Sequence, residues 1–242
     1  MRQFTVNALN HHHGMQANER FGARWTGTDD FDEDGVNDEI NRADVSALVL
    51  WQATLPPPSV DTTVPQNWQE AASRGSELFD DISCNECHQR TLPLDSLLFH
   101  DPGPVDAAGT LRRDELGSEL NAVYNLELLD WAQQLEKDDQ GRWLVPVFGD
   151  LKRHVIADTQ VDTLGNELLS QRFVERNVFM TAELWGIGST APYGHRGDLT
   201  TLNEVITAHG GDARDSRDAY IELDELAKSD INAFLKTLVI PQ

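Results

Sequence analysis

The sequence predicts a mainly α protein in two parts: a partial helical segment of one domain over residues 1–60, and a helical domain with long loops over residues 61–242. Two observations support this class. Apolar residues recur at helical spacing near both ends of the second part, and stretches rich in proline, glycine and acidic residues separate the other elements. Hydrophobic residues make up 39% of the chain, which is low for a globular protein and predicts long polar segments.

The first part is predicted to contain a helix followed by a loop over residues 1–27, an acidic loop over 28–41 and an amphipathic helix over 42–55. Three consecutive prolines must end this second helix, because proline lacks the amide hydrogen that an α-helix needs. They open a proline-rich linker over residues 56–66, which places the domain boundary near residue 60.

Apolar helices are predicted near both ends of the second part. The first lies in the segment NWQEAASRGSELF, where Gly75 can pass close to another backbone. The last begins at Ser229 as its N-cap and ends before the C-terminal proline. Residues 100–140 are polar and rich in loop-forming residues, so we expect a long surface excursion with one helix around residues 127–136.

The charge of the chain excludes several classes of partner. Lysine and arginine number 19 against 41 acidic residues, so the formal net charge is −22 at pH 7. Binding to nucleic acid depends on clustered basic residues, and an anionic membrane surface would repel this chain. No apolar run is long enough for membrane insertion, and no signal peptide is visible at the N-terminus.

The two cysteines of the chain, Cys84 and Cys87, form a C-x-x-C-H motif with His88. This motif is the attachment signature of haem c: the thiols form thioethers with the haem vinyl groups, and the histidine becomes the proximal iron ligand. Three alternatives are weaker. A thioredoxin-like redox pair does not need the histidine, a zinc knuckle needs two further ligands at short spacing, and a disulfide across this loop would be strained. The sequence therefore predicts one covalent haem c.

The opposite face of the iron requires a second candidate ligand. His209 has the best local setting, because Thr201 and Glu204 form a capping-box pattern for a helix on which His209 shares the apolar face with Leu202 and Val205. We therefore predict His88 and His209 as the two iron ligands, and interpret Met180 as a core residue. The other candidates are His154, His195 and the cluster His11, His12 and His13.

The acidic loop contains the pattern D-x-D-x-D-G, which is the first half of an EF-type calcium loop. Gly35 falls where such a loop turns sharply, but Asn41 replaces the glutamate that normally closes the site. Either Asp38 or Glu39 would have to close the shell instead, and the alternative is a solvated acidic loop. The predicted calcium ligands are Asp30, Asp32, Asp34, Val36 through its carbonyl, and Glu39.

Several segments together resemble one family. The sequence G-x-x-L-F before the C-x-x-C-H motif is similar to the first helix of class I cytochromes c. Residues 184–197, LWGIGSTAPYGHRG, resemble the T-A-P-Y-x-H-D-G segment of bacterial di-haem cytochrome c peroxidases, with Arg196 in place of the aspartate. The segments FGDLKRH at 148–154 and LNEVITAHGG at 202–211 are similar to the di-haem oxidoreductase, or thiol oxidase, branch of that superfamily, and so are NALNHHHGMQANERFG and the acidic loop.

This resemblance implies two class I cytochrome c-like helical domains, with calcium near their interface. It also implies an N-terminal peroxidatic haem and a C-terminal electron-transfer haem. In the peroxidases a methionine is the distal ligand of the second haem, and the corresponding place in this chain holds His209. Family members carry two C-x-x-C-H motifs, whereas this sequence contains one, so it is similar to the C-terminal haem portion.

The favoured function is electron transfer by a c-type haem within a di-haem peroxidase-like oxidoreductase. A haem with two histidine ligands has no open position, so peroxidase-like or thiol-oxidising activity would require a second haem domain on the same or another chain. One alternative is a free-standing monohaem electron carrier that serves a redox partner protein, and a weaker one is a calcium-stabilised structural module. Because haem c is attached outside the cytoplasmic membrane, we expect a periplasmic or otherwise exported protein.

Overall fold

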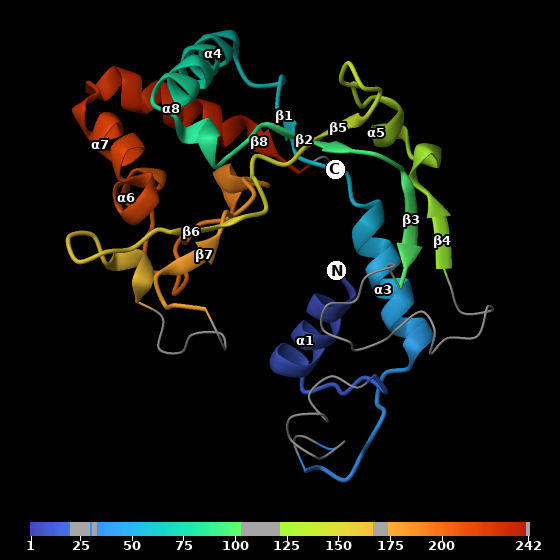
Figure 1. The fold of residues 1–242 in the computed structure, drawn as a ribbon. Helices are drawn as coiled ribbons and strands as arrows, with labels where there is room; N and C mark the ends of the chain where they lie inside the picture. The colour runs from blue at the N-terminus through green and yellow to red at the C-terminus, as the bar shows by residue number, and fades with distance from the viewer. Residues whose placement is uncertain (20–29, 31–32, 103–121, 167–173, 241–242) are drawn as a thin grey trace. The chain divides into compact units, whose positions relative to one another are not determined.

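The computed structural model describes residues 1–19, 30, 33–102, 122–166 and 174–240. The chain divides into two compact units (Figure 1). The first comprises Met1–Leu55, Asp95–Leu135 and Gly141–Trp143, and the second comprises Pro56–Leu94, Glu136–Gln140 and Leu144–Gln242. This division differs from the predicted single boundary near residue 60. Most of the segment 100–140, which was predicted to be a long surface loop region, belongs to the first unit.

In its described residues, the first unit combines three α-helices, the third of only four residues, with one antiparallel strand pair. Helix α1 and helix α3 contact one another and bury Val6, Val45 and Val49 between them, together with Ile40. The Asn41 side chain caps α3 by accepting hydrogen bonds from the backbone amides two and three residues further along the chain. The elements of this unit are α1 (Arg2–His13), α3 (Arg42–Thr54), β3 (Leu98–Asp101), β4 (Ala122–Asn125), η3 (Leu126–Leu128) and α5 (Asp130–Gln133).

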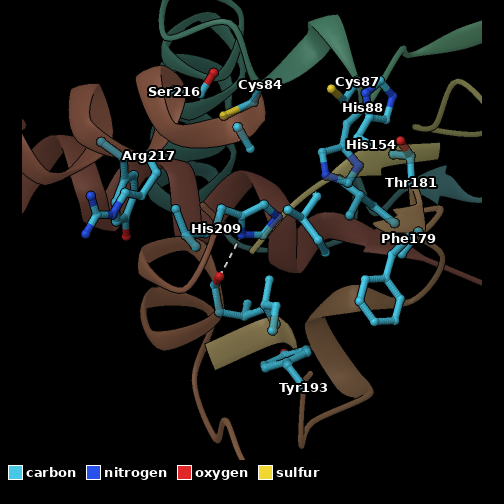
Figure 2. A pocket seen from close by; sticks show the side chains of 18 of the residues that line it. Cys84, Cys87, His88, His154, Phe179, Thr181, Tyr193, His209, Ser216 and Arg217 are labelled. Atoms are coloured by element: carbon cyan, nitrogen blue, oxygen red, sulfur yellow. Dashed lines mark hydrogen bonds between the residues drawn. The ribbon is translucent and has the colours of Figure 1, made fainter. Parts of the chain in front are cut away.

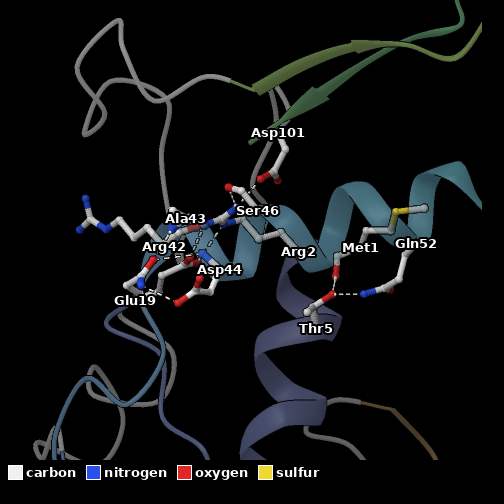
Figure 3. A network of polar contacts seen from close by, with 11 residues as sticks. Met1, Arg2, Thr5, Glu19, Arg42, Ala43, Asp44, Ser46, Gln52 and Asp101 are labelled. Carbon is white, nitrogen blue, oxygen red and sulfur yellow. Dashed lines mark hydrogen bonds and ion pairs between the residues drawn. The ribbon is translucent and has the colours of Figure 1, made fainter. Parts of the chain in front are cut away.

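A buried ionic network ties the parts of the first unit together (Figure 3). The Arg2 guanidinium pairs with the carboxylates of Glu19 and Asp101, whose side chains are 0% and 3% exposed. It also donates a hydrogen bond of 2.7 Å to Ser46 Oγ. Because a buried charge without a partner is costly, these contacts fix α1 against α3 and β3.

The described residues of the second unit form four α-helices, several 3₁₀ turns and several short strands. Its elements in chain order are β1 (Ser59–Val60), α4 (Gln66–Asp81), η1 (Cys84–Glu86), β2 (Thr91–Leu94), β5 (Trp143–Pro146), β6 (Arg153–Val155), η4 (Thr163–Gly165), β7 (Val178–Met180), η5 (Ile187–Ser189), α6 (Leu202–Thr207), η6 (Gly211–Ala213), α7 (Arg214–Glu222), α8 (Glu225–Thr237) and β8 (Leu238–Val239). In the described residues β1 pairs with β8, β2 with β5, and β6 with β7. None of the described helices has the length and apolar character needed to cross a membrane.

Helices α4 and α8 cross at Gly75. A Cβ atom added to Gly75 would lie 1.9 Å from the carbonyl oxygen of Asp230, so the crossing confirms the close backbone approach expected at this glycine. Beside it, the Arg74 guanidinium donates to both oxygens of the Asp230 carboxylate at 2.7 and 2.9 Å. Phe79 and Phe234 meet edge to face in the core beneath, with ring centroids 5.5 Å apart.

The predicted mainly α class, a class I cytochrome c-like helical domain after a partial helical segment, is wrong as stated. Of the described residues, 44% are helical and 15% lie in strands, which form several small antiparallel sheets. The strands arise where loop segments pair edge to edge, as Arg153–Val155 does with Val178–Met180. Ladders of two to four residues are too short to produce the alternating apolar pattern by which a strand is recognised in a sequence.

We expect Gly75→Ala to destabilise the second unit by about 3 kcal/mol, because the new methyl group would collide with the backbone of α8. The matched control is Gly149→Ala, whose Cβ would meet the Glu183 side chain at an ordinary 3.4 Å. Denaturant unfolding followed by circular dichroism measures both. Equal unfolding free energies for the two variants would contradict the tight crossing.

Candidate haem-binding site

The second unit contains a cavity of about 370 Å³ (Figure 2), a volume typical of ligand pockets. The C-x-x-C-H motif, helices α6, α7 and α8, and the segments around Thr181 and Tyr193 line it. Most of its wall is apolar, and it includes Phe79, Leu184, Leu202, Ile206, Tyr220 and Leu235. The structure thus brings the predicted residues Cys84, Cys87, His88 and His209 to one apolar cavity.

The C-x-x-C-H motif follows α4 directly and forms a single 3₁₀ turn. Ser83 takes a left-handed conformation at φ 63°, and the His88 amide then donates to the Cys84 carbonyl at 3.0 Å. Both cysteines are free thiols. Burial raises the pKa of the Cys84 thiol to about 12 and also raises that of Cys87, whereas a reactive redox pair requires a lowered thiol pKa.

Cys87 of the motif also belongs to a cluster of possible metal ligands, so the alternative of a zinc site has to be considered. Among the described residues, Cys87, Asp150 and His154 offer ligand atoms that all lie within 4.8 Å of one another. This set leaves Cys84 out, and four protein ligands are usual at a structural zinc site. The cluster therefore does not account for the first cysteine of the motif.

His88 is held by a backbone carbonyl. Its Nδ1 lies 3.1 Å from the carbonyl oxygen of Phe148, and since a carbonyl only accepts, Nδ1 carries the proton. Burial first, and the neighbouring His209 second, lower the pKa of His88 to about 4. The imidazole is therefore neutral at pH 7, and neutral imidazole is the form that binds a metal.

His209 is held in the same way at the end of α6. Its Nδ1 donates to the carbonyl oxygen of Val205 at 2.7 Å, and burial lowers the pKa of this histidine as well. The predicted capping box is confirmed, because Thr201 and Glu204 exchange side-chain and backbone hydrogen bonds at the start of the helix. After His209 the chain passes so close to Val155 that a Cβ on Gly211 would lie 2.1 Å from its carbonyl oxygen.

The two imidazoles have a separation that suits one metal ion between them. Their ring centroids are 6.5 Å apart and their planes meet at 63°. Two imidazoles that bind opposite sides of an ion at about 2.0–2.1 Å have centroids roughly 6–7 Å apart. With both Nδ1 protons donated to carbonyls, each ring has Nε2 as its unprotonated nitrogen. These residues fit an axially ligated haem.

The other distal candidates lie in different settings. The interpretation of Met180 as a core residue is wrong: it ends the short strand β7 and is 55% exposed, although it touches the cavity wall. His195 stacks on Phe179, and His154 bonds to Asp150. The cluster His11, His12 and His13 ends helix α1 in the first unit.

Two aspartates that sequence reasoning had not singled out organise the loops around the cavity. Asp150 is buried and accepts hydrogen bonds from the Lys152 amide at 2.9 Å and from His154 Nε2 at 2.7 Å. Asp158 accepts from the amide of Gly211 at 2.6 Å and pairs with Arg214, which fixes the turn after His209. Asp150 lies inside FGDLKRH, so only the resemblance of that segment could have indicated it.

The acidic loop is only partly described, since Asp32 lies outside the described residues. The Gly35 amide donates to Asp30 Oδ2 at 3.1 Å, and the Val36 amide donates to Asp34 Oδ1 at 2.7 Å. Gly35 has a φ of 86°, as expected for a sharp turn. The carboxylate of Glu39 instead accepts a hydrogen bond of 2.7 Å from the amide of Gln16.

A comparison with known protein families indicates the same cofactor, haem, as the residues of the cavity do. Residues 137–238 match the family described as "Di-haem oxidoreductase, putative peroxidase", and they correspond to the C-terminal portion of that family. The resemblance stated from the sequence is thereby confirmed for this part of the chain, which includes His209 but begins after the C-x-x-C-H motif. A comparison with curated proteins finds no match. The family implies haem and an oxidoreductase-like redox role.

We expect Asp150 to give this unit a measurable acid sensitivity. Burial alone would raise the pKa of this carboxyl, but hydrogen bonds from Lys152, Thr181 and His154 outweigh it and lower the pKa to about 2. The stabilisation is therefore complete above the unfolded pKa of about 4 and is lost as the pH falls through 2. Asp150→Asn should be less stable than the wild type at pH 7, and urea unfolding should show this difference shrinking between pH 4 and 2. A difference independent of pH would contradict the role of the carboxylate.

Proposed function

We propose that this chain holds one covalent haem c and transfers electrons as the C-terminal haem portion of a di-haem peroxidase-like oxidoreductase. Cys84 and Cys87 would form the thioethers, and His88 and His209 would be the axial ligands. One observation carries the proposal: two neutral, half-buried imidazoles line one apolar cavity with their ring centroids 6.5 Å apart, beside two free thiols.

The residues of the cavity have distinct tasks in this function. Bound haem supplies a one-electron iron couple. The carbonyls of Phe148 and Val205 hold the Nδ1 protons, which orients both rings and raises the basicity of the opposite nitrogens. The apolar wall would exclude water from the bound group, and with both His88 and His209 holding the iron the site would offer peroxide no place to bind. The cavity therefore suits electron transfer better than bond cleavage.

Catalysis of peroxide reduction or thiol oxidation would then need a second haem with an open iron. We propose that a second haem domain, on the same or another chain, supplies it, and that the −22 charge favours cationic redox partners. The alternative is a monohaem carrier without a substrate, which the single C-x-x-C-H motif favours. Covalent haem attachment supports a periplasmic or otherwise exported location in either case.

His209→Ala should convert the haem from six-coordinate low-spin to a largely high-spin form, because it removes one of the two axial imidazoles. Electronic absorption and electron paramagnetic resonance spectra measure the change, and new peroxide reactivity is expected in the opened site. The matched control is Met180→Leu, which changes an exposed cavity residue and should leave the spectrum unaltered.

A near-infrared sulfur-to-iron charge-transfer band that disappears in Met180→Leu would overturn the assignment of His209. It would indicate histidine–methionine ligation and a higher reduction potential. A purified protein without covalently bound haem would overturn the proposed function itself. A second haem in the purified assembly would favour the di-haem enzyme over the monohaem carrier.

We further propose that the acidic loop binds calcium through Asp30, Asp32, Asp34, the Val36 carbonyl and Glu39. An ion that binds only the folded chain stabilises it by about 2.7 kcal/mol at a free concentration 100 times its Kd. Chelation should therefore lower the melting temperature of calcium-loaded protein, and Asp34→Asn should remove most of this response. An unchanged melting temperature after chelation of protein that metal analysis shows to be loaded would contradict the site.

A further inference from the structure

The carbonyl that holds His88 belongs to a residue with a strained backbone. Phe148 has a φ of 50°, so its backbone is left-handed, and the residue is only 6% exposed. This conformation costs free energy in any residue other than glycine, because the backbone crowds the Cβ atom. It persists only where the surrounding structure imposes it. The contacts that hold Phe148 therefore also determine where its carbonyl oxygen lies, 3.1 Å from Nδ1 of His88.

Hydrogen bonds join Phe148 to the segment directly after the C-x-x-C-H motif. The Arg90 carbonyl accepts from the amides of Val147 and Phe148 at 3.1 and 3.5 Å. The Gln89 carbonyl accepts from the amide of Gly149 at 3.0 Å. The backbone of residues 89–90 is thus paired with the peptide whose carbonyl supports the iron ligand, so a displacement of Arg90 would also displace that carbonyl.

The Arg90 side chain anchors these paired segments to helix α4. Its guanidinium donates to the carbonyl and the hydroxyl of Ser76, both at 2.9 Å, and to the two carboxylate oxygens of Asp80 at 3.3 and 3.0 Å. The side chains of Arg90 and Asp80 are 35% and 41% exposed, so solvent screens their attraction and the ion pair alone stabilises little. The directed N–H groups of the guanidinium, more than its charge, therefore fix its position.

The same guanidinium also lies over three aromatic rings. Its central carbon is 5.3 Å from the ring centroid of Phe234, 5.8 Å from that of Phe79 and 5.9 Å from that of Phe148. Contacts between a cation and an aromatic ring within about 6 Å are attractive. A lysine ammonium would keep the charge, but it lacks the planar group that rests on the rings and the several donors that reach α4.

We infer that Arg90 is a positioning residue for the iron ligand His88: its guanidinium and its backbone carbonyl hold Phe148 in the conformation that directs the Phe148 carbonyl at Nδ1 of His88. A carbonyl that accepts this proton orients the ring and makes the opposite nitrogen a stronger donor, which favours ferric iron. Arg90 thereby tunes the reduction potential, although it is not among the described residues that line the cavity. The inference rests on the proposed haem and on His88 as its ligand.

The test compares haem-loaded wild-type protein with three variants. Arg90→Lys keeps the charge and removes the planar donor group, and Phe148→Leu removes the ring beneath it. The matched control is Arg74→Lys, which removes a two-pronged contact between α4 and the Asp230 carboxylate. A potentiometric titration followed by absorption measures the ferric–ferrous equilibrium. The g values in electron paramagnetic resonance report the relative orientation of the two axial imidazole planes.

In Arg90→Lys and in Phe148→Leu the equilibrium should shift about threefold to tenfold towards ferrous iron, because a weaker hydrogen bond at Nδ1 makes His88 a poorer donor. The g values should change in the same variants, since the ring is then less firmly oriented. Arg74→Lys should lower the free energy of unfolding but leave the equilibrium and the g values as they are in the wild type.

An unchanged equilibrium and unchanged g values in Arg90→Lys, with low-spin covalent haem retained, would overturn this inference and leave the proposed function intact. An equal shift in Arg74→Lys would overturn it too, because the effect would then be a general loosening of the unit. If Arg90→Lys does not fold, Phe148→Leu is judged by the same criterion. Absence of covalent haem from the wild type would overturn both the inference and the proposed function.

Discussion

The crossing of α4 and α8 at Gly75 is the constraint on which the second unit depends. The two helices come from opposite ends of this unit, and only a residue without a side chain lets the Gly75 backbone reach the Asp230 carbonyl. The ionic contact between Arg74 and Asp230 and the packing of Phe79 on Phe234 follow from that approach. Since the C-x-x-C-H motif begins just after α4, the crossing also determines where both thiols lie.

The geometry of the cavity then depends on backbone carbonyls more than on charged side chains. The Nδ1 atoms of His88, His195 and His209 all face carbonyl oxygens, from Phe148, Leu164 and Val205 respectively. A carbonyl fixes the tautomer of an imidazole without adding charge, which matters in a cavity that lowers the pKa of His88 and His209 through burial. Asp150 and Asp158 stabilise the loops around the cavity by accepting hydrogen bonds from the backbone amides of Lys152 and Gly211.

The first unit is organised on a different principle. Its small apolar core is supplemented by the buried Arg2 guanidinium, which joins two buried carboxylates from distant parts of the chain. Such a network specifies one arrangement of its segments, because displacing any one of them would leave a charge unpaired in the interior. The match to the di-haem oxidoreductase family lies in residues 137–238, so the chemistry proposed for the chain belongs to the second unit.

The sequence by itself determined the local chemistry: the thiols and imidazole of C-x-x-C-H, the capping box before His209, and the need for glycine at position 75. These are properties of short segments, where spacing alone fixes which groups lie together. Only the tertiary structure decided the small antiparallel sheets, the exposure of Met180 and the stacking of His195 on Phe179. Each of these depends on contacts between segments that no local pattern encodes, such as the pairing of Arg153–Val155 with Val178–Met180.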